Sequence, residues 1–197
     1  GVTTNPRHVQ ASGKPFLTVI REIAALFAGT DKPISVEVNP HHTDYEKMVA
    51  EAEVLAAMSP NFVIKLPAIE AGYKAVAVLK EKGIRSNLTL VFSAAQALHA
   101  MRMGAYFVSP FIGWKEANGE EVQSFIEEIL AIRDNYGFSS EIIVAAVRNG
   151  RQIADAAVMG ADIVTAGLAV YKDAFDHPYT GVGLQKFQEF WDQTPYK

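Results

Sequence analysis

Short runs of β-branched and other apolar residues alternate with longer amphipathic segments along almost the whole chain, and this alternation narrows the choice of fold more than any other feature. The spacing of apolar residues and the positions of turn residues predict strands at 34–38, 62–66, 87–92, 106–111, 142–147 and 163–166. They predict helices at 15–27, 45–57, 70–82, 94–103, 122–136, 151–159 and about 182–192. Glycine follows several of these helices, as is common where a helix ends. The pattern indicates repeated βα units.

Most predicted strands are apolar at consecutive positions, which is typical of a parallel sheet covered on both faces. Two architectures fit this pattern, an open doubly wound sheet and a (β/α)8 TIM barrel. No glycine-rich phosphate loop or dinucleotide fingerprint follows a strand, which favours the barrel. With residues 1–5 counted as a strand, about seven of the eight βα units are present. We therefore predict one barrel domain over residues 1–197, apparently lacking the first strand and helix in this chain, which starts without methionine.

Composition excludes several classes of function. With 22 acidic and 18 basic residues, the 197-residue chain has a formal net charge of −4, so we do not expect a nucleic-acid partner. The absence of cysteine removes thiolate metal sites and cysteine nucleophiles. The neighbouring His41 and His42 lack an evident third ligand, so we expect no metal. Neither a signal peptide nor an apolar run of membrane-spanning length is evident, and we expect a cytoplasmic protein without membrane contact.

A lysine lies inside one of the predicted strands. Alternation in the strand at 62–66 places Phe62, Ile64 and Leu66 on one face and Lys65 on the other. An unpaired ammonium inside a barrel is unfavourable by several kcal/mol, and this favours the neutral amine. A neutral amine attacks carbonyl carbon and forms a Schiff base. The alternative is a lysine that ends its strand and extends to solvent.

Neighbouring strands carry polar residues with the same parity as Lys65. In the strand at 87–92 we expect both leucines on one face and the polar residues on the other. The predicted inward set comprises Glu37, Lys65, Asn87, Thr89, Ser109, Phe111, Ala146 and Arg148. These residues lie near the carboxyl ends of their strands, where barrel enzymes have their active sites. A buried lysine grouped with a glutamate and a threonine suits amine catalysis with a water-activating base. The alternative is a structural polar network.

Four motifs resemble those of the transaldolases and their small relatives, the fructose-6-phosphate aldolases. They are Gly-Val-Thr-Thr-Asn-Pro at 1–6, Val-Ile-Lys-Leu-Pro at 63–67, Asn-Leu-Thr-Leu-Val-Phe-Ser at 87–93 and Val-Ser-Pro-Phe-Ile-Gly at 108–113. The resemblance covers essentially the whole chain and implies a Schiff-base aldolase on an (α/β)8 barrel that needs no cofactor. It also implies a strand and helix before Gly1, and that strand carries the family's catalytic aspartate.

The resemblance assigns roles to individual positions. Lys65 matches the Schiff-base lysine, and Glu37 and Thr89 match the pair that holds the catalytic water. The aldolase branch has glutamine in place of Glu37, so the glutamate favours the transferase branch, as does Asn87. The positions that match substrate-contacting residues are Thr3, Asn5, Asn87 and Ser109, with Phe111 as the aromatic residue beside the lysine.

The expected phosphate site departs from the family pattern. Trp114 and Ala146 stand where the family usually has an arginine and a serine, and Arg148 remains. A sulfonate carries one charge and accepts hydrogen bonds more weakly than a phosphate, so these changes suit a sulfonate. The pattern looks like that of the 6-deoxy-6-sulfofructose transaldolases of sulfoquinovose breakdown. The expected anion-binding residues are Arg7, Trp114, Lys115 and Arg148. In the alternative interpretation Trp114 only packs at the barrel mouth and Arg7 contacts a phosphate.

The resemblance thus implies a transaldolase that cleaves 6-deoxy-6-sulfofructose to 3-sulfolactaldehyde and transfers a dihydroxyacetone unit to an aldehyde such as glyceraldehyde 3-phosphate. The alternatives are an ordinary transaldolase, a fructose-6-phosphate aldolase and an inactive sugar-binding barrel. The partners we expect are small sugars and further copies of the chain. In this family the last helix packs on neighbouring subunits, so we predict a homo-oligomer, such as a decameric ring, held by the helix at about 182–192.

Overall fold

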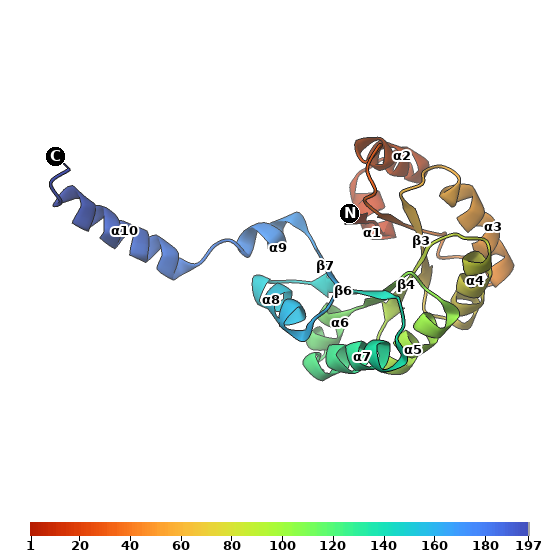
Figure 1. The fold of residues 1–197 in the computed structure, drawn as a ribbon. Helices are drawn as coiled ribbons and strands as arrows, with labels where there is room; N and C mark the ends of the chain where they lie inside the picture. The colour runs from red at the N-terminus through yellow and green to blue at the C-terminus, as the bar shows by residue number, and fades with distance from the viewer. Residues whose placement is uncertain (197) are drawn as a thin grey trace.

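The computed structural model describes residues 1–196 and has seven parallel strands in one curved sheet, surrounded by helices (Figure 1). The order of strands in the sheet is β1-β2-β3-β4-β5-β6-β7, the order of the sequence. A doubly wound sheet would instead reverse its direction at a switch point. The predicted barrel that lacks one βα unit is therefore confirmed, and the open-sheet alternative is wrong.

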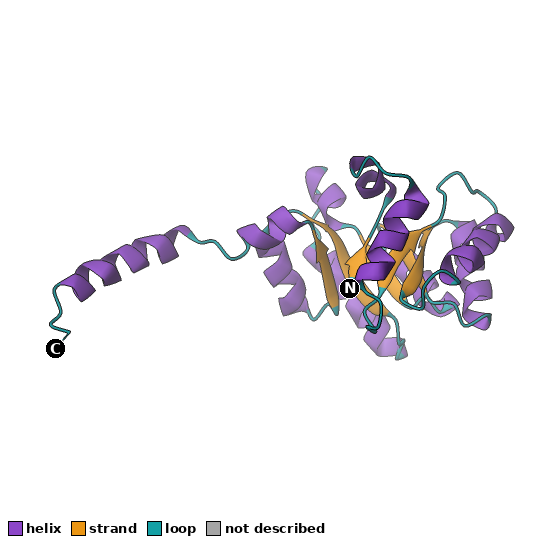
Figure 2. Cartoon of the chain, turned by 90° about the horizontal axis from the view of Figure 1, so that it is seen from above, coloured by secondary structure: helices purple, strands orange, loops and turns teal. Residues whose placement is uncertain are grey.

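The elements follow each other as strand and helix along the chain (Figure 2). The strands are β1 (Val2–Thr3), β2 (Ile34–Glu37), β3 (Phe62–Pro67), β4 (Ser86–Val91), β5 (Phe107–Pro110), β6 (Glu141–Val147) and β7 (Ile163–Ala166). The longer helices are α2 (Phe16–Leu26), α3 (Tyr45–Ala56), α4 (Glu70–Glu81), α5 (Ala94–Met103), α7 (Gln123–Tyr136), α8 (Gly150–Met159) and α10 (Pro178–Asp192). Three six-residue helices that the periodicity does not predict follow β1, β5 and β7 directly, namely α1 (Pro6–Ala11), α6 (Ile112–Ala117) and α9 (Leu168–Asp173).

Two separate apolar clusters cover the two faces of the sheet. Ile64 and Leu66 belong to the large cluster between the strands and the helices. Val63 belongs to a smaller cluster with Phe107 and Ile143. Since Lys65 has the parity of Val63, it faces the interior of the barrel. The sequence-based assignment of this strand is confirmed.

Two bulges break the alternation, and the sequence-based assignments of Leu90 and Ala146 are wrong. Leu88 and Val91 both pack in the outer cluster, with a register shift between them. Leu90 has φ of 59°, a left-handed conformation that inserts an extra residue into the strand. The two leucines of β4 therefore do not share a face.

The same kind of bulge occurs in β6. Val144 and Val147 pack in the outer cluster across a second register shift, and Ala146 between them has φ of 60°. Ile143 belongs to the inner cluster, and Ala145 bridges Phe111 of the neighbouring chain segment. The inward residue of β6 is thus Ala145 and not Ala146, because the bulge shifts the alternation by one residue.

The first and last strands approach each other at the open side of the barrel. Thr3 Oγ1 and Thr165 Oγ1 form a hydrogen bond of 2.8 Å between β1 and β7. No backbone pairing joins these two strands within residues 1–196. A side-chain hydrogen bond thus links the two edge strands where the described residues form no backbone ladder.

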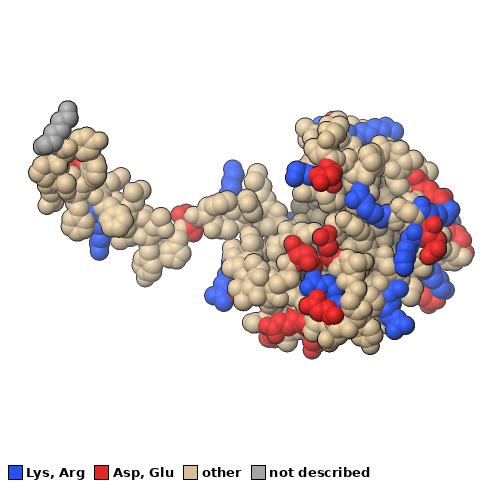
Figure 3. Space-filling view, viewed as in Figure 1, with Lys and Arg blue, Asp and Glu red and all other residues tan. Residues whose placement is uncertain are grey.

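Helix α10 extends away from the barrel as an arm and contains no buried residue (Figures 1 and 2). Its aromatic side chains are exposed, with Phe187 at 71% and Trp191 at 60%. In the space-filling view most charged side chains lie on the barrel, and the arm carries few (Figure 3). Among the described residues, no helix combines the length and the apolar character that a membrane crossing would require.

Candidate active site

Lys65 occupies the centre of the polar interior. Its side chain is 5% exposed, and it faces Glu37 on one neighbouring strand and Asn87 on the other in the sheet register. This placement follows from the parallel pairing of β2, β3 and β4, which brings three polar residues into one row across the sheet. The structure therefore brings together three of the residues singled out from the sequence.

The ammonium group of Lys65 has two partners in the structure. Nζ donates to Glu37 Oε2 at 3.1 Å and to the backbone carbonyl of Thr4 at 3.1 Å. Glu37 is also largely buried, with its side chain 13% exposed. The attraction between two buried charges offsets the free-energy cost of their desolvation only while both partners stay in place. Glu37 is within reach to accept a proton from Nζ when an electrophile arrives.

Asn87 is held on both sides by hydroxyl groups. Its Nδ2 donates to Ser35 Oγ at 3.0 Å, and its Oδ1 accepts from Ser109 Oγ at 2.7 Å. All three residues are at most 2% exposed. These bonds fix the amide orientation and leave one Nδ2 hydrogen to bind an oxygen in the interior. Ser35 was not among the residues predicted from the sequence, although its parity with Glu37 indicates the same face of β2.

Thr89 contributes a hydroxyl to the same interior. It lies opposite Pro67 in the register, and it is 1% exposed. Its Oγ1 makes no hydrogen bond with any of the described residues. Buried hydroxyls nearly always have a partner, so this one is suited to bind a water molecule or a substrate oxygen.

The two threonines and the asparagine of the first motif have different surroundings. Thr3 forms a hydrogen bond with Thr165, which was not among the residues predicted from the sequence. Thr4 is buried, and its carbonyl binds Lys65. Asn5 caps α1 by accepting the backbone N–H of His8 on Oδ1 at 2.9 Å, which leaves its amide N–H groups to other partners. The motif thus places the hydroxyl of Thr3, the carbonyl of Thr4 and the amide of Asn5 at the carboxyl end of β1.

Aromatic rings gather where β4 and β5 end. Phe111 contacts Phe92 with ring centroids 5.8 Å apart and Trp114 with centroids 6.0 Å apart. Phe92 stacks on Trp114 at 5.7 Å. Trp114 is 55% exposed, so its ring forms an outer apolar surface of this group.

The three candidate basic residues lie in different environments. Lys115 forms an ion pair with Glu120 and lies 5.0 Å from the ring centre of Phe125, between α6 and α7. Arg148 is exposed and passes over Gly113, where a Cβ would lie 2.9 Å from its Nε. Arg7 is exposed on α1. The structure does not gather these cations into one cluster. The approach of Arg148 to Gly113 places it beside α6.

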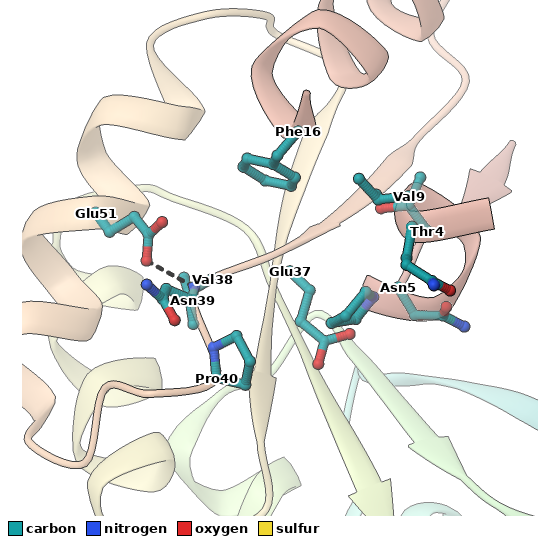
Figure 4. A pocket seen from close by; sticks show the side chains of 11 residues that line it. Thr4, Asn5, Val9, Phe16, Glu37, Val38, Asn39, Pro40 and Glu51 are labelled. Atoms are coloured by element: carbon teal, nitrogen blue, oxygen red, sulfur yellow. Dashed lines mark hydrogen bonds between the residues drawn. The ribbon is translucent and has the colours of Figure 1, made fainter. Parts of the chain in front are cut away.

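Glu37 also lines a cavity of about 350 Å³ outside β1 (Figure 4). Asn5 and Val9 form one side of this cavity, and Pro40 and Glu51 form the other. Glu37 also contacts Lys65. Of the two residues of this buried pair, Glu37 is the one that lines the cavity.

Sequence comparisons relate the chain to one family. Residues 1–194 match the family model described as Transaldolase/Fructose-6-phosphate aldolase. Over 195 residues the chain is 53% identical to proteins of Priestia aryabhattai and Priestia megaterium named 6-deoxy-6-sulfo-D-fructose transaldolase, covering 98% of this chain and 86% of each relative. It is 47% identical over 194 residues to a probable transaldolase of Caulobacter sp., covering 98% of this chain and 87% of that relative.

Proposed function

Because the chain belongs to the transaldolase/fructose-6-phosphate aldolase family and is an enzyme of the transaldolase type, we propose that Lys65 forms the Schiff base with its donor sugar. One observation carries this assignment. Lys65 is buried near the carboxyl end of β3 with its Nζ 3.1 Å from the carboxylate of Glu37. A nucleophilic amine next to a group that can take its proton is the arrangement that Schiff-base chemistry requires.

The reaction begins when the ketose carbonyl at C2 approaches Lys65. Glu37 accepts a proton from the ammonium, and the resulting amine adds to C2 to give a carbinolamine. Loss of the former carbonyl oxygen as water then yields an iminium ion. Glu37 and the hydroxyl of Thr89 hold one water molecule between them and transfer protons during this step and its reversal. The unpartnered hydroxyl of Thr89 supports this role.

Cleavage follows at the bond between C3 and C4. The electron pair of this bond moves into the iminium system and leaves a three-carbon enamine on Lys65, while C4 becomes an aldehyde carbon and its hydroxyl proton passes to a base. Asn87, fixed by Ser35 and Ser109, donates its remaining amide hydrogen to a hydroxyl of the three-carbon unit. The enamine then adds to an acceptor aldehyde, and hydrolysis releases the new ketose.

The donor that we propose is 6-deoxy-6-sulfofructose, which gives 3-sulfolactaldehyde as the first product, with glyceraldehyde 3-phosphate as acceptor. The 53% identity to two proteins that carry this substrate in their names supports the assignment. The exposed guanidinium of Arg148, which lies over Gly113 on α6, supports it as well, since a single cation suits a singly charged sulfonate. Arg7, which is exposed on α1, is the second candidate cation, whereas Lys115 already forms an ion pair with Glu120.

Covalent trapping tests the assignment of Lys65. Borohydride added with the donor sugar reduces the Schiff base, and mass spectrometry of the digested protein should find the increase on the peptide that contains Lys65. Lys65→Met should abolish it. Lys82→Met, which changes an exposed lysine on the outside of the barrel, should leave it intact. A wild-type protein that gains no mass at Lys65 would refute the amine mechanism.

A comparison of donors tests the substrate. Turnover of 6-deoxy-6-sulfofructose and of fructose 6-phosphate is measured with and without an acceptor aldehyde. We expect the sulfonate donor to be preferred and turnover to require the acceptor. Preference for the phosphate would make the protein an ordinary transaldolase, and release of free dihydroxyacetone without acceptor would make it an aldolase.

A further inference from the structure

The strand that carries Glu37 extends beyond its neighbour. β1 pairs with β2 only at Val2 with Ile34 and at Thr3 with Ser35. The last backbone contact between them is the bond from the N–H of Thr4 to the carbonyl of Ser35, after which the chain turns into α1. Glu37 lies two residues beyond this point. Among the described residues, no strand therefore covers that edge of β2 beside Glu37.

A cavity lies along the edge of β2 that β1 does not cover. Its volume is about 350 Å³, and residues 37–40 form one of its walls (Figure 4). The opposite wall comes from α1 and from Phe16 at the start of α2. A chain segment that borders a cavity has fewer packing contacts to hold it in place than one between two strands. On the other edge, β3 does hold the segment, because the N–H of Val38 donates to the carbonyl of Lys65.

Glu51 binds the unsupported edge. Its Oε2 accepts the backbone N–H of Asn39 at 2.7 Å, as the dashed line in Figure 4 shows. The same oxygen is 3.1 Å from Nε2 of His42, so Glu51 contacts the loop at two points. The loop is further closed by the bond from the N–H of His41 to Asn39 Oδ1 at 3.0 Å.

The helix that carries Glu51 is itself firmly packed. Met48 and Ala52, which flank Glu51 on α3, are fully buried, and Leu55 is 2% exposed. The carboxylate therefore projects from a fixed base onto a segment that the sheet supports on one edge only. A charge-assisted hydrogen bond to a backbone N–H is stronger than a neutral one, and it supplies a restraint where a ladder bond would otherwise lie.

We infer that Glu51 is a positioning residue that holds the end of β2 so that the carboxylate of Glu37 stays within hydrogen-bond distance of Lys65. This inference rests on the proposed Schiff-base function of Lys65. Glu51 takes no part in the chemistry, and its effect on the reaction passes through Glu37.

Three variants test the inference by the rate of borohydride-trapped adduct formation in a single turnover. Glu51→Ala, which removes the restraint, should slow this rate by about tenfold, since small misplacements of catalytic groups are costly. Glu51→Gln retains an oxygen for the N–H of Asn39 and should recover the rate to within about threefold. The matched control is Glu53→Gln on the same helix, whose side chain pairs with Lys82 on the surface. It should match the wild type.

A double substitution separates positioning from a general loss of structure. In a Glu37→Gln background, the further change Glu51→Ala should alter the rate less than about twofold, because the group that Glu51 positions is already impaired. An equal tenfold loss in both backgrounds would overturn the inference, as would a Glu51→Ala protein that reacts at the wild-type rate. Thermal unfolding of each variant checks that the compared proteins are folded. Glu51→Gln is the milder change, so it serves as the test variant if Glu51→Ala does not fold.

The wild-type reaction distinguishes the two levels of the proposal. If the wild type forms an adduct on Lys65 and Glu51→Ala forms it equally fast, only the positioning role is refuted. If the wild type forms no adduct on Lys65, the Schiff-base function itself is refuted, and the positioning role is refuted with it.

Discussion

The buried pair of Lys65 and Glu37 allows a quantitative prediction about stability. In Glu37→Leu, Lys65 keeps only the carbonyl of Thr4 as a partner, at 3.1 Å. Removal of one partner from a buried ion pair destabilises proteins by about 3 to 5 kcal/mol. We therefore expect Glu37→Leu to lower the free energy of unfolding by about 3 to 5 kcal/mol.

The opposite substitution should be milder. In Lys65→Met the remaining carboxylate of Glu37 is 13% exposed and borders the cavity, where water can solvate it. We expect a loss of about 1 to 2 kcal/mol for this variant. The double variant leaves no unpaired charge and should lie within about 1 kcal/mol of the wild type.

Urea-induced unfolding at pH 7, followed by far-UV circular dichroism at one protein concentration, measures these differences. Glu22→Gln serves as a control for an exposed pair, since Lys14 and Glu22 are 50% and 53% exposed, and it should change stability by less than about 0.5 kcal/mol. A loss below about 1 kcal/mol for Glu37→Leu, or losses that simply add in the double variant, would refute the argument that the pair is buried and mutually dependent.

Three further predictions concern other parts of the molecule. Arg148→Ala should raise KM for the sulfonate donor by about tenfold, and Lys115→Ala by less than about twofold, because an acidic neighbour already binds Lys115; equal effects in steady-state kinetics would contradict this. Asp44 caps α3, and its hydrogen bond from the backbone N–H of Lys47 holds the pKa of its carboxyl below the ordinary value. The stabilisation of the folded protein by this cap is therefore present above the unfolded-state pKa of about 3.9. It is lost as the pH falls through the lower folded-state pKa. The difference in Tm between the wild type and Asp44→Ala should accordingly vanish in acid. The exposed aromatic residues of α10 predict a homo-oligomer, so light scattering should give a mass above 21.5 kDa that falls when residues 178–197 are deleted, and a monomeric wild type would refute this.

The barrel was predictable from the sequence because its strands and helices differ in period and in length. The inward orientation of Lys65 followed from simple alternation, since β3 has no bulge and every second residue packs on the helices. Alternation failed at Leu90 and Ala146, where a left-handed residue is inserted. Neither residue type signals such a conformation, because glycine or asparagine is the usual choice there. Tertiary packing on both sides of the strand determines these bulges, and a single sequence does not record it.

The candidate site was predictable to the extent that its residues lie on strands. Register brings Glu37 and Asn87 to Lys65, and the strand parity of these residues could be inferred from the sequence. The contacts from outside the strands were not predictable. The carbonyl of Thr4 has no side-chain signature, and Glu51 comes from a helix, where its carboxylate looks like one of several surface charges.

The consecutive order of the strands bears on how the chain folds. Each strand pairs with the one before it, and paired residues such as Asn87 and Phe107, or Phe107 and Glu141, are close in sequence. The hydroxyl contact between β1 and β7 instead joins residues 162 positions apart. By the logarithmic dependence on loop length, closing this contact costs only about 1.4 kcal/mol more chain entropy than closing the longest pairing of adjacent strands. Each pairing of adjacent strands closes a shorter loop than this contact does, so folding can proceed by adding one βα unit at a time, with the meeting of the two ends as a late step.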